Sequence, residues 1–245
     1  MALEPFRVPV PGWEGASGGF FYLPEFLSFS ESDSVLKKID AAPSLKWKQL
    51  AHRRLQSWGG QILERDGRLV PEPMPPFLTT HPRLLARIRD TTAFHDSIHK
   101  EPNHCLVNEY MAGQGIMPHN DGPTYFPAVA TLSLGGHVLL DIYPWREARE
   151  AYPTTPLFSI LQEPRSLLII QGDAYRNYLH GIAERTQDDA PRMANVANSA
   201  QLSAPLNDLV DAARRGENVL CSRERRVSLT FRDVERVQRG LRIGR

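Results

Sequence analysis

The segment Arg226-Val-Ser-Leu-Thr-Phe-Arg232 alternates between polar and apolar residues at every position. Successive side chains of an extended strand point to opposite faces, so the pattern predicts a strand with one apolar and one polar face. We expect the apolar face to join the core. An edge strand that faces water would give the same alternation, so the pattern alone does not say what the polar face meets. That face carries Arg226, Ser228, Thr230 and Arg232.

Other segments after residue 104 share this character, because they are short, rich in β-branched and apolar residues, and separated by glycine and proline. The residues before them carry helix signals instead. Ser30 is a candidate N-cap for a helix that continues to Ala42, and a second helix is predicted to begin near Pro82. Helices followed by many short strands predict a mostly β fold with flanking helices and a double-stranded β-helix (jelly roll) core. The predicted strands are Cys105–Met111, Ala128–Leu134, His137–Tyr143, Leu157–Leu161, Ser166–Gln171 and Arg226–Arg232.

The length of 245 residues suits one domain. Within it we expect N-terminal helices and a candidate substrate lid over residues 1–103, and a jelly-roll core over residues 104–232. An insertion over residues 183–224 reads as polar and irregular, with one short helix around Asn207–Arg214, and is predicted to be either functional or disordered. Residues 233–245 form a basic tail.

The composition, with 41% hydrophobic and 23% charged residues, is that of a globular protein that buries a core. Two cysteines, Cys105 and Cys221, support neither a disulfide framework nor a thiolate metal site. The chain has no apolar run long enough to cross a bilayer and no signal peptide at its start, so we expect the cytoplasm and the nucleus, with no membrane partner.

Net charge is +1, which gives no general argument for a nucleic acid partner. The charge is unevenly placed, however, since Arg214–Arg245 holds 10 arginines against 4 acidic residues. This segment is either a local basic surface or a solvated charged strand and tail.

The sequence His119-Asn-Asp121 places an imidazole and a carboxylate two residues apart, so that on extended backbone both face one side. Two histidines and one carboxylate leave three positions of an octahedron open, as in non-haem Fe(II) oxygenases. A hydrogen-bonded surface pair would give the same two residues, so a third ligand is needed. His104 and His137 also lie beside predicted strands, but only His180 is followed by a glycine that allows close backbone approach.

A pocket for a small dicarboxylate is suggested by the polar face of Arg226–Arg232, where two arginines flank two hydroxyls. The planar guanidinium binds a carboxylate through two parallel hydrogen bonds. Asn108 and Tyr110 share a face of another predicted strand, so they can hydrogen-bond the same ligand.

Taken in order, these four elements resemble the AlkB family of Fe(II)- and 2-oxoglutarate-dependent dioxygenases: Asn108-X-Tyr110, His119-X-Asp121, His180 before glycine, and the closing strand between two arginines. The resemblance covers residues 105–232. Wider features, among them Gly115-Ile-Met-Pro-His-Asn-Asp-Gly-Pro123, resemble the subfamily of the sixth AlkB homologue.

The resemblance implies that His119, Asp121 and His180 ligate Fe(II) and that 2-oxoglutarate and O2 are cosubstrates. It implies that Arg226, helped by Tyr110, pairs with the distal carboxylate of 2-oxoglutarate, and that Asn108 and Arg232 lie by its metal-chelating end. Ser228 stands where members that repair DNA commonly have asparagine, so this cosubstrate pocket is not identical to theirs. The activity implied is oxidative demethylation of an alkylated nucleic acid, with release of formaldehyde.

The substrate lid implied by the resemblance is Lys48–Gly60, which offers Arg53, Arg54 and Trp58 to a single-stranded or flipped base of DNA or RNA. Tyr125 and Trp145 are alternative pocket aromatics, and Trp58 can equally be a loop aromatic anchored on the core. Two other functions stay open: a dioxygenase that acts on a protein or a small molecule, and an inert binding module that retains the metal.

Overall fold

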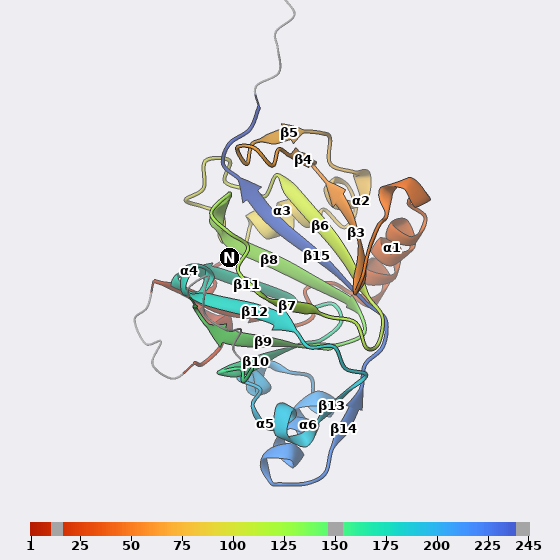
Figure 1. The fold of residues 1–245 in the computed structure, drawn as a ribbon, viewed down its shortest axis with the longest axis vertical. Helices are drawn as coiled ribbons and strands as arrows, with labels where there is room; N and C mark the ends of the chain where they lie inside the picture. Colours follow the sequence, from red (N-terminus) through yellow and green to blue (C-terminus); the bar gives the residue numbers. More distant parts are fainter. Residues whose placement is uncertain (11–16, 147–153, 239–245) are drawn as a thin grey trace, which may run out of the picture.

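Two antiparallel sheets form the centre of the molecule (Figure 1). The structure is a computed structural model that describes residues 1–10, 17–146 and 154–238. The larger sheet has the strand order β1-β11-β8-β15-β6-β3-β2 and the smaller sheet the order β10-β9-β12-β7. The strands of the larger sheet are β1 (Gly18–Leu23), β2 (Lys48–Leu50), β3 (Arg53–Trp58), β6 (His104–Tyr110), β8 (Tyr125–Gly135), β11 (Leu167–Gly172) and β15 (Arg226–Val234), and those of the smaller sheet are β7 (Ile116–His119), β9 (Val138–Pro144), β10 (Phe158–Gln162) and β12 (Tyr178–Ile182).

All six predicted strands are present, and the mostly β fold with flanking helices is confirmed. Five other strands of the two sheets were not predicted from the sequence. Four of them lack a clear apolar run, since for example β3 is largely polar and β7 contains a proline at position 118. The exception is β1, whose apolar run Phe20–Leu23 was overlooked in the sequence. These strands are β1, β2, β3, β7 and β12.

Strand β15 lies in the middle of the larger sheet and pairs with β6 on one side and β8 on the other. Its register sets Arg226 opposite Tyr110 and Ser228 opposite Asn108. Its apolar residues, Val227, Leu229 and Phe231, are buried in the core on the helix-covered side of the sheet, as the alternation predicts. The opposite face of β15 therefore points into the space between the sheets.

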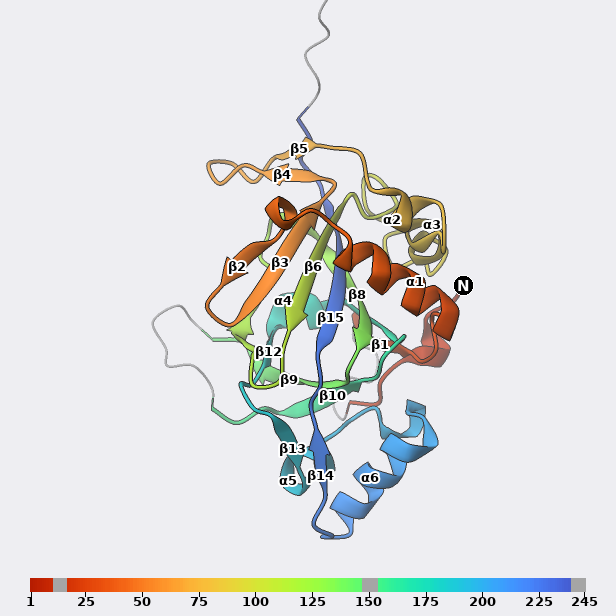
Figure 2. The ribbon, with the colours of Figure 1, turned by 90° about the vertical axis from the view of Figure 1, so that its right-hand side faces the viewer.

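Helices cover the outer face of the larger sheet (Figure 2). Helix α1 (Phe29–Asp40) buries Val35 and Ile39 against this sheet, together with α2 (Pro76–Thr79) and α3 (Leu84–Arg89). The predicted N-cap at Ser30 was wrong, because Ser28 accepts a hydrogen bond from the Glu31 backbone and the Glu31 side chain returns one to the Ser28 backbone. This reciprocal capping box is stronger than a lone hydroxyl two residues later.

The segment over residues 183–224 contains regular helices and strands, so the prediction of an irregular stretch was wrong. It contains β13 (Gln187–Asp189), α5 (Ala190–Ala194), the 3-10 helix η3 (Ser199–Gln201), α6 (Ala204–Arg214) and β14 (Leu220–Ser222). The short helix predicted around Asn207–Arg214 is present, as part of the helix Ala204–Arg214. Met193, Val196 and Val210 pack with Leu139 and Leu161 of the smaller sheet. The segment thus covers the outer face of that sheet, and the sequence missed it because its apolar residues are widely spaced.

A second core lies between the two sheets and includes Phe20, Val129, Leu140 and Ile170. The remaining regular elements are the 3-10 helices η1 (Glu4–Phe6) and η2 (Ser44–Lys46), the hairpin β4 (Gly60–Ile62) with β5 (Leu69–Pro71), and the short helix α4 (Asp173–Asn177). Among the described residues, every helix is too short or too polar to span a bilayer.

Candidate metal centre

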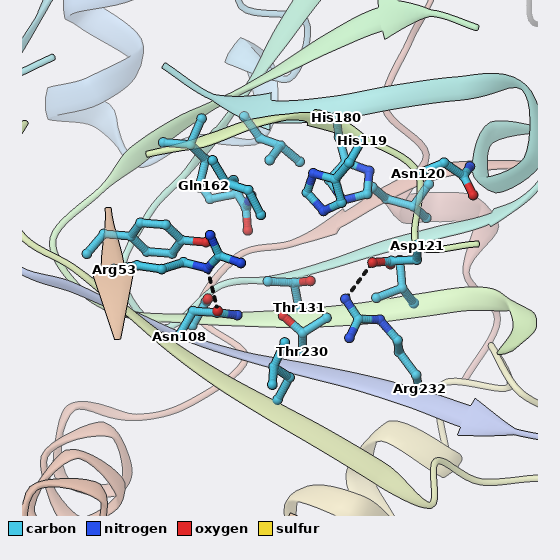
Figure 3. A pocket seen from close by; sticks show the side chains of 18 of the residues that line it. Arg53, Asn108, His119, Asn120, Asp121, Thr131, Gln162, His180, Thr230 and Arg232 are labelled. Carbon is cyan, nitrogen blue, oxygen red and sulfur yellow. Dashed lines mark hydrogen bonds and ion pairs between the residues drawn. The ribbon is translucent and has the colours of Figure 1, made fainter. Parts of the chain in front are cut away.

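Two histidines and one aspartate meet between β7 and β12. The two strands pair antiparallel with His119 directly opposite His180, and Asp121 follows His119 by two residues. The imidazole rings are 4.5 Å apart between centroids, and the candidate ligand atoms of the three side chains all lie within 4.8 Å of one another. In Figure 3 the side chains of His119, His180 and Asp121 point toward the same part of a cavity.

Local hydrogen bonds hold these side chains in place. His119 Nδ1 donates to the carbonyl oxygen of Met117 at 2.9 Å, which leaves the lone pair on Nε2 for a metal. After His119, the Asn120 side chain accepts a hydrogen bond from the Gly122 backbone at 2.8 Å, and Tyr175 Oη donates to the Gly122 carbonyl at 2.9 Å. The turn that carries Asp121 is therefore fixed from both sides.

The protonation states suit a divalent cation. Burial lowers the pKa of His180 to about 3, and burial also lowers the pKa of His119. Burial alone would raise the pKa of Asp121, but the nearby charge of Arg232 outweighs this and holds that pKa below its ordinary value. At neutral pH the site thus holds two neutral imidazoles and a carboxylate, the forms in which these side chains bind metal.

One carboxylate oxygen of the triad lacks a partner. Asp121 Oδ1 accepts a hydrogen bond from Arg232 at 2.5 Å, whereas the buried Asp121 Oδ2 has no hydrogen-bond partner in the described part of the chain. A buried carboxylate oxygen without a partner is unfavourable, and a cation between the three side chains would satisfy it. The residues present therefore fit a metal such as Fe(II) with three protein ligands.

The cavity beside the triad has a volume of about 280 Å³ and lies between the two sheets. Strand β15 contributes the polar face that its alternation predicts, and β6 contributes Asn108 and Tyr110. The structure thus brings together all eight residues predicted for the metal and the cosubstrate: His119, Asp121, His180, Asn108, Tyr110, Arg226, Ser228 and Arg232.

Arg226 is a buried cation with neutral partners. Its Nη2 donates to Ser133 Oγ at 2.8 Å and to Gln162 Oε1 at 3.3 Å, and its buried Nε has no partner among the described residues. Burial lowers the pKa of Arg226 to about 10, so the guanidinium stays charged at neutral pH. A buried charge without a counter-charge is unfavourable, and a carboxylate ligand would neutralise it.

The four residues predicted to contact substrate separate into two pairs. Arg53 and Tyr125 line the cavity. Arg54 and Trp58 do not, because they lie on the other face of β3. There Arg54 donates to Glu109 Oε1 at 3.0 Å, and Trp58 packs edge-on against Phe77 at 5.7 Å.

The structure therefore favours the alternative that Trp58 is anchored on the core. Trp145, whose exposed fraction is 52%, is also absent from the cavity wall. The other histidines considered as ligands lie elsewhere, since His104 hydrogen-bonds Ser57 at 3.0 Å and His137 pairs with Asp188 at 3.5 Å.

Sequence reasoning missed several polar residues of the site. Thr131 and Gln162 line the cavity, and Asn120 and Tyr175 shape the turn around Asp121. The sequence could have indicated Thr131, because it is a polar residue within a predicted strand that is otherwise apolar. The contribution of Tyr175 depends on a contact across more than fifty residues and leaves no local pattern.

Several arginines between Arg223 and Arg232 bind acidic residues inside the molecule. Arg223 pairs with Asp188 at 2.7 Å, Arg225 with Glu109 at 2.7 Å, and Arg232 with Asp121. The exposed charge of the segment Arg214–Arg245 is therefore smaller than its sequence count, and residues 239–245 lie outside the described residues.

Comparisons with known proteins agree with this geometry. The profile of the 2OG-Fe(II) oxygenase superfamily matches residues 19–232. A protein of Danio rerio named "Probable RNA/DNA demethylase ALKBH6" is 37% identical over 226 residues, which cover 89% of this chain and 87% of that protein. A Xenopus tropicalis protein named "tRNA (carboxymethyluridine(34)-5-O)-methyltransferase alkbh8" is 26% identical, over 88% of this chain and 32% of its own length. The solved structure described as "The structure of OsALKBH1" shares the fold, with a TM-score of 0.51, 16% identity, and coverage of 89% of this chain and 99% of that one.

Proposed function

Because this chain belongs to the AlkB family within the 2OG-Fe(II) oxygenase superfamily, we propose that it demethylates an alkylated nucleic acid. The Danio rerio relative is named as a probable RNA/DNA demethylase, and its similarity extends over nearly the whole of both chains. A nucleic acid substrate would place the enzyme in the cytoplasm and the nucleus.

In this proposal His119, Asp121 and His180 hold the iron. Fe(II) with 2-oxoglutarate and O2 supplies an oxidant that hydroxylates a C–H bond, and a hydroxylated N-methyl group leaves as formaldehyde. The hydrogen bond from His119 Nδ1 to Met117 keeps the imidazole turned with Nε2 toward the metal. Arg232 binds Asp121 Oδ1 and thereby orients Oδ2 toward the same point.

The buried Arg226 is the observation that carries the cosubstrate assignment. Its guanidinium has an unpartnered Nε and no acidic partner among the described residues, so a carboxylate, such as the distal one of 2-oxoglutarate, is the ligand it lacks. Tyr110 lies beside it, with the guanidinium carbon 5.9 Å from the ring centroid, and Ser228 and Asn108 supply hydrogen-bonding groups on the same side of the sheet. We propose that 2-oxoglutarate extends from Arg226 to the metal.

The base must reach the metal as a single strand or by flipping. The triad lies within the space between two sheets, and a base inside a duplex stack cannot enter a cavity of about 280 Å³ together with its neighbours. Arg53 and Tyr125 are the residues of the cavity wall that we propose contact it.

The test is formation of succinate and formaldehyde from 2-oxoglutarate with Fe(II) and O2, with and without methylated single-stranded oligonucleotides. Asp121→Ala is the control that removes a metal ligand. Turnover stimulated by one oligonucleotide, with formaldehyde in equal amount, supports the proposal. Asp121-dependent turnover that no oligonucleotide stimulates contradicts it and directs the search to proteins and small molecules, and no turnover at all supports an inert binding module.

A further inference from the structure

We infer that the active site accepts a methylated base that is electrically neutral and discriminates against bases that methylation makes cationic, with Arg53 as the residue that sets this preference. The inference rests on the proposed function, because it assumes a nucleic acid substrate. It concerns the charge of the methylated group, which the family assignment leaves open.

The charges on the cavity wall are unbalanced. Among the described residues, the wall carries three arginines, Arg53, Arg226 and Arg232, and a single carboxylate, Asp121. Fe(II) and the 2-oxoglutarate dianion cancel each other when both are bound. The filled site therefore keeps two more positive than negative protein charges, in a cavity between two sheets where solvent screening is weak.

The one carboxylate is not available to a cationic base. Asp121 Oδ1 is bound by Arg232 at 2.5 Å, and Oδ2 is the atom that faces the metal position. A cationic base can also be bound by an aromatic face, but the two tyrosines of the wall already have arginines beside them. The guanidinium carbon of Arg232 lies 5.0 Å from the Tyr125 ring centroid, and that of Arg226 lies 5.9 Å from the Tyr110 centroid.

Arg53 is the arginine that remains for the substrate. Arg232 is engaged with Asp121, and Arg226 is buried at the cosubstrate position. Arg53 comes from β3, and the hydrogen bond recorded for its side chain in the described part of the chain runs from Nε to Asn108 Oδ1 at 3.2 Å. Figure 3 shows Arg53 and Asn108 on one side of the cavity and the Asp121–Arg232 pair on another.

Its guanidinium suits a carbonyl oxygen or a ring nitrogen with a free lone pair. Methylation that places a positive charge on the ring would set that charge beside Arg53. The remaining polar wall, with Thr131, Thr230 and Gln162, is neutral and suits hydrogen bonds to an uncharged base.

Isomeric bases give a direct test. 1-Methyladenine is a cation at neutral pH and N6-methyladenine is neutral, although both carry one methyl group. We would measure the Kd of single-stranded oligonucleotides that differ only in this base, by fluorescence anisotropy with Fe(II) and 2-oxoglutarate in the absence of O2. Because backbone contacts are common to both, the ratio of the two Kd values reports on the base alone.

For the wild-type protein we expect the neutral isomer to bind at least about tenfold more tightly, which corresponds to about 1.4 kcal/mol. Arg53→Glu should remove or reverse this ratio, and Arg53→Gln should reduce it. Lys48→Glu is the matched control, because Lys48 is exposed on the same hairpin, pairs with β3 and does not line the cavity. The ratio of the two Kd values measured for Lys48→Glu should equal the ratio measured for the wild type.

Four results would overturn the inference. Equal or tighter binding of 1-methyladenine by the wild type, accompanied by formaldehyde release, contradicts it while the proposed function stands. An Arg53→Glu protein that weakens both isomers equally makes Arg53 a phosphate contact, and one that raises only the KM for 2-oxoglutarate makes it a cosubstrate residue. If neither methylated oligonucleotide binds more tightly than the unmethylated one and no formaldehyde appears, the proposed function fails together with the inference. If the thermal melt shows that Arg53→Glu does not fold, the Kd ratio of Arg53→Gln tests the inference instead. An unchanged ratio in that variant would then exclude Arg53 as the residue that sets the preference.

Discussion

Replacing Arg226 with lysine keeps the positive charge of the cosubstrate position but removes the planar fork of donors. Lysine presents a compact ammonium in place of two parallel N–H groups, so a carboxylate bound by Arg226 loses one charge-assisted hydrogen bond. Such a bond contributes about 1.5 to 3 kcal/mol, which corresponds to a Kd for 2-oxoglutarate that is roughly ten- to a hundredfold higher. The fold should survive, since Ser133 and Gln162 can still accept from an ammonium at this position.

The assay is isothermal titration of 2-oxoglutarate into the Fe(II) protein without O2, which separates binding from turnover. Arg225→Lys is the control, because Arg225 is the preceding residue, lies outside the cavity wall, and pairs instead with Asp40 at 2.5 Å and Glu109 at 2.7 Å. This control should bind 2-oxoglutarate as the wild type does. An unchanged Kd in Arg226→Lys, or an equal loss in both variants, would refute the assignment of Arg226 to the distal carboxylate.

Three further predictions concern the metal, the ordered segment and pH. Asp121→Ala should abolish Fe(II)-dependent succinate formation while the far-UV circular dichroism stays native, and succinate at the wild-type rate would exclude Asp121 as a ligand. Met193→Ala should lower the free energy of unfolding by about 2 to 5 kcal/mol, because Met193 is fully buried against the smaller sheet. Urea titration measures this free energy. A loss below about 1 kcal/mol would show that the segment over residues 183–224 is only loosely packed. Burial lowers the pKa of His137, but hydrogen bonds and charge from Asp188 and Cys221 outweigh burial and raise this pKa to about 9. A histidine in the unfolded chain has a pKa of about 6.5. The folded state therefore binds the His137 proton more tightly than the unfolded chain does. The resulting stability, on the order of 3 kcal/mol, is fully present below about pH 6.5 and is lost as pH rises through 9. Urea titrations from pH 6 to 9.5 should show this decline, and the same decline in His137→Gln would assign it to another group.

Much of the fold and of the site could be predicted from the sequence because the signals are local. The alternation of Arg226–Arg232 identified both faces of β15, and the spacing of His119 and Asp121 placed two candidate metal ligands on one side. The orientation of Trp58 could not be predicted from its sequence neighbours. The sequence indicates that a tryptophan and two arginines lie near two glycines, but only the register of β3 against β6 decides that Arg53 faces the cavity and Trp58 faces the helices.

Apart from its helix around Asn207–Arg214, the segment over residues 183–224 could not be predicted, for a different reason. Its buried residues are separated by polar ones, and their partners Leu139 and Leu161 lie far back in the chain. The same holds for the paired arginines near the end of the chain. Their charge count suggested an exposed surface, whereas acids from distant segments, such as Asp40, Glu109 and Asp188, bind them.

Strand β15 comes after every other strand of the two sheets in the chain, yet it lies between β6 and β8 in the larger sheet. During synthesis on a ribosome, β1, β11 and β8 can form one group and β6, β3 and β2 another before Arg226 is translated. Each group would then present an open edge of backbone N–H and C=O groups, which is a template for pairing with other chains. A message truncated ahead of Arg226 would thus leave two unjoined half-sheets, prone to aggregation and in need of a chaperone.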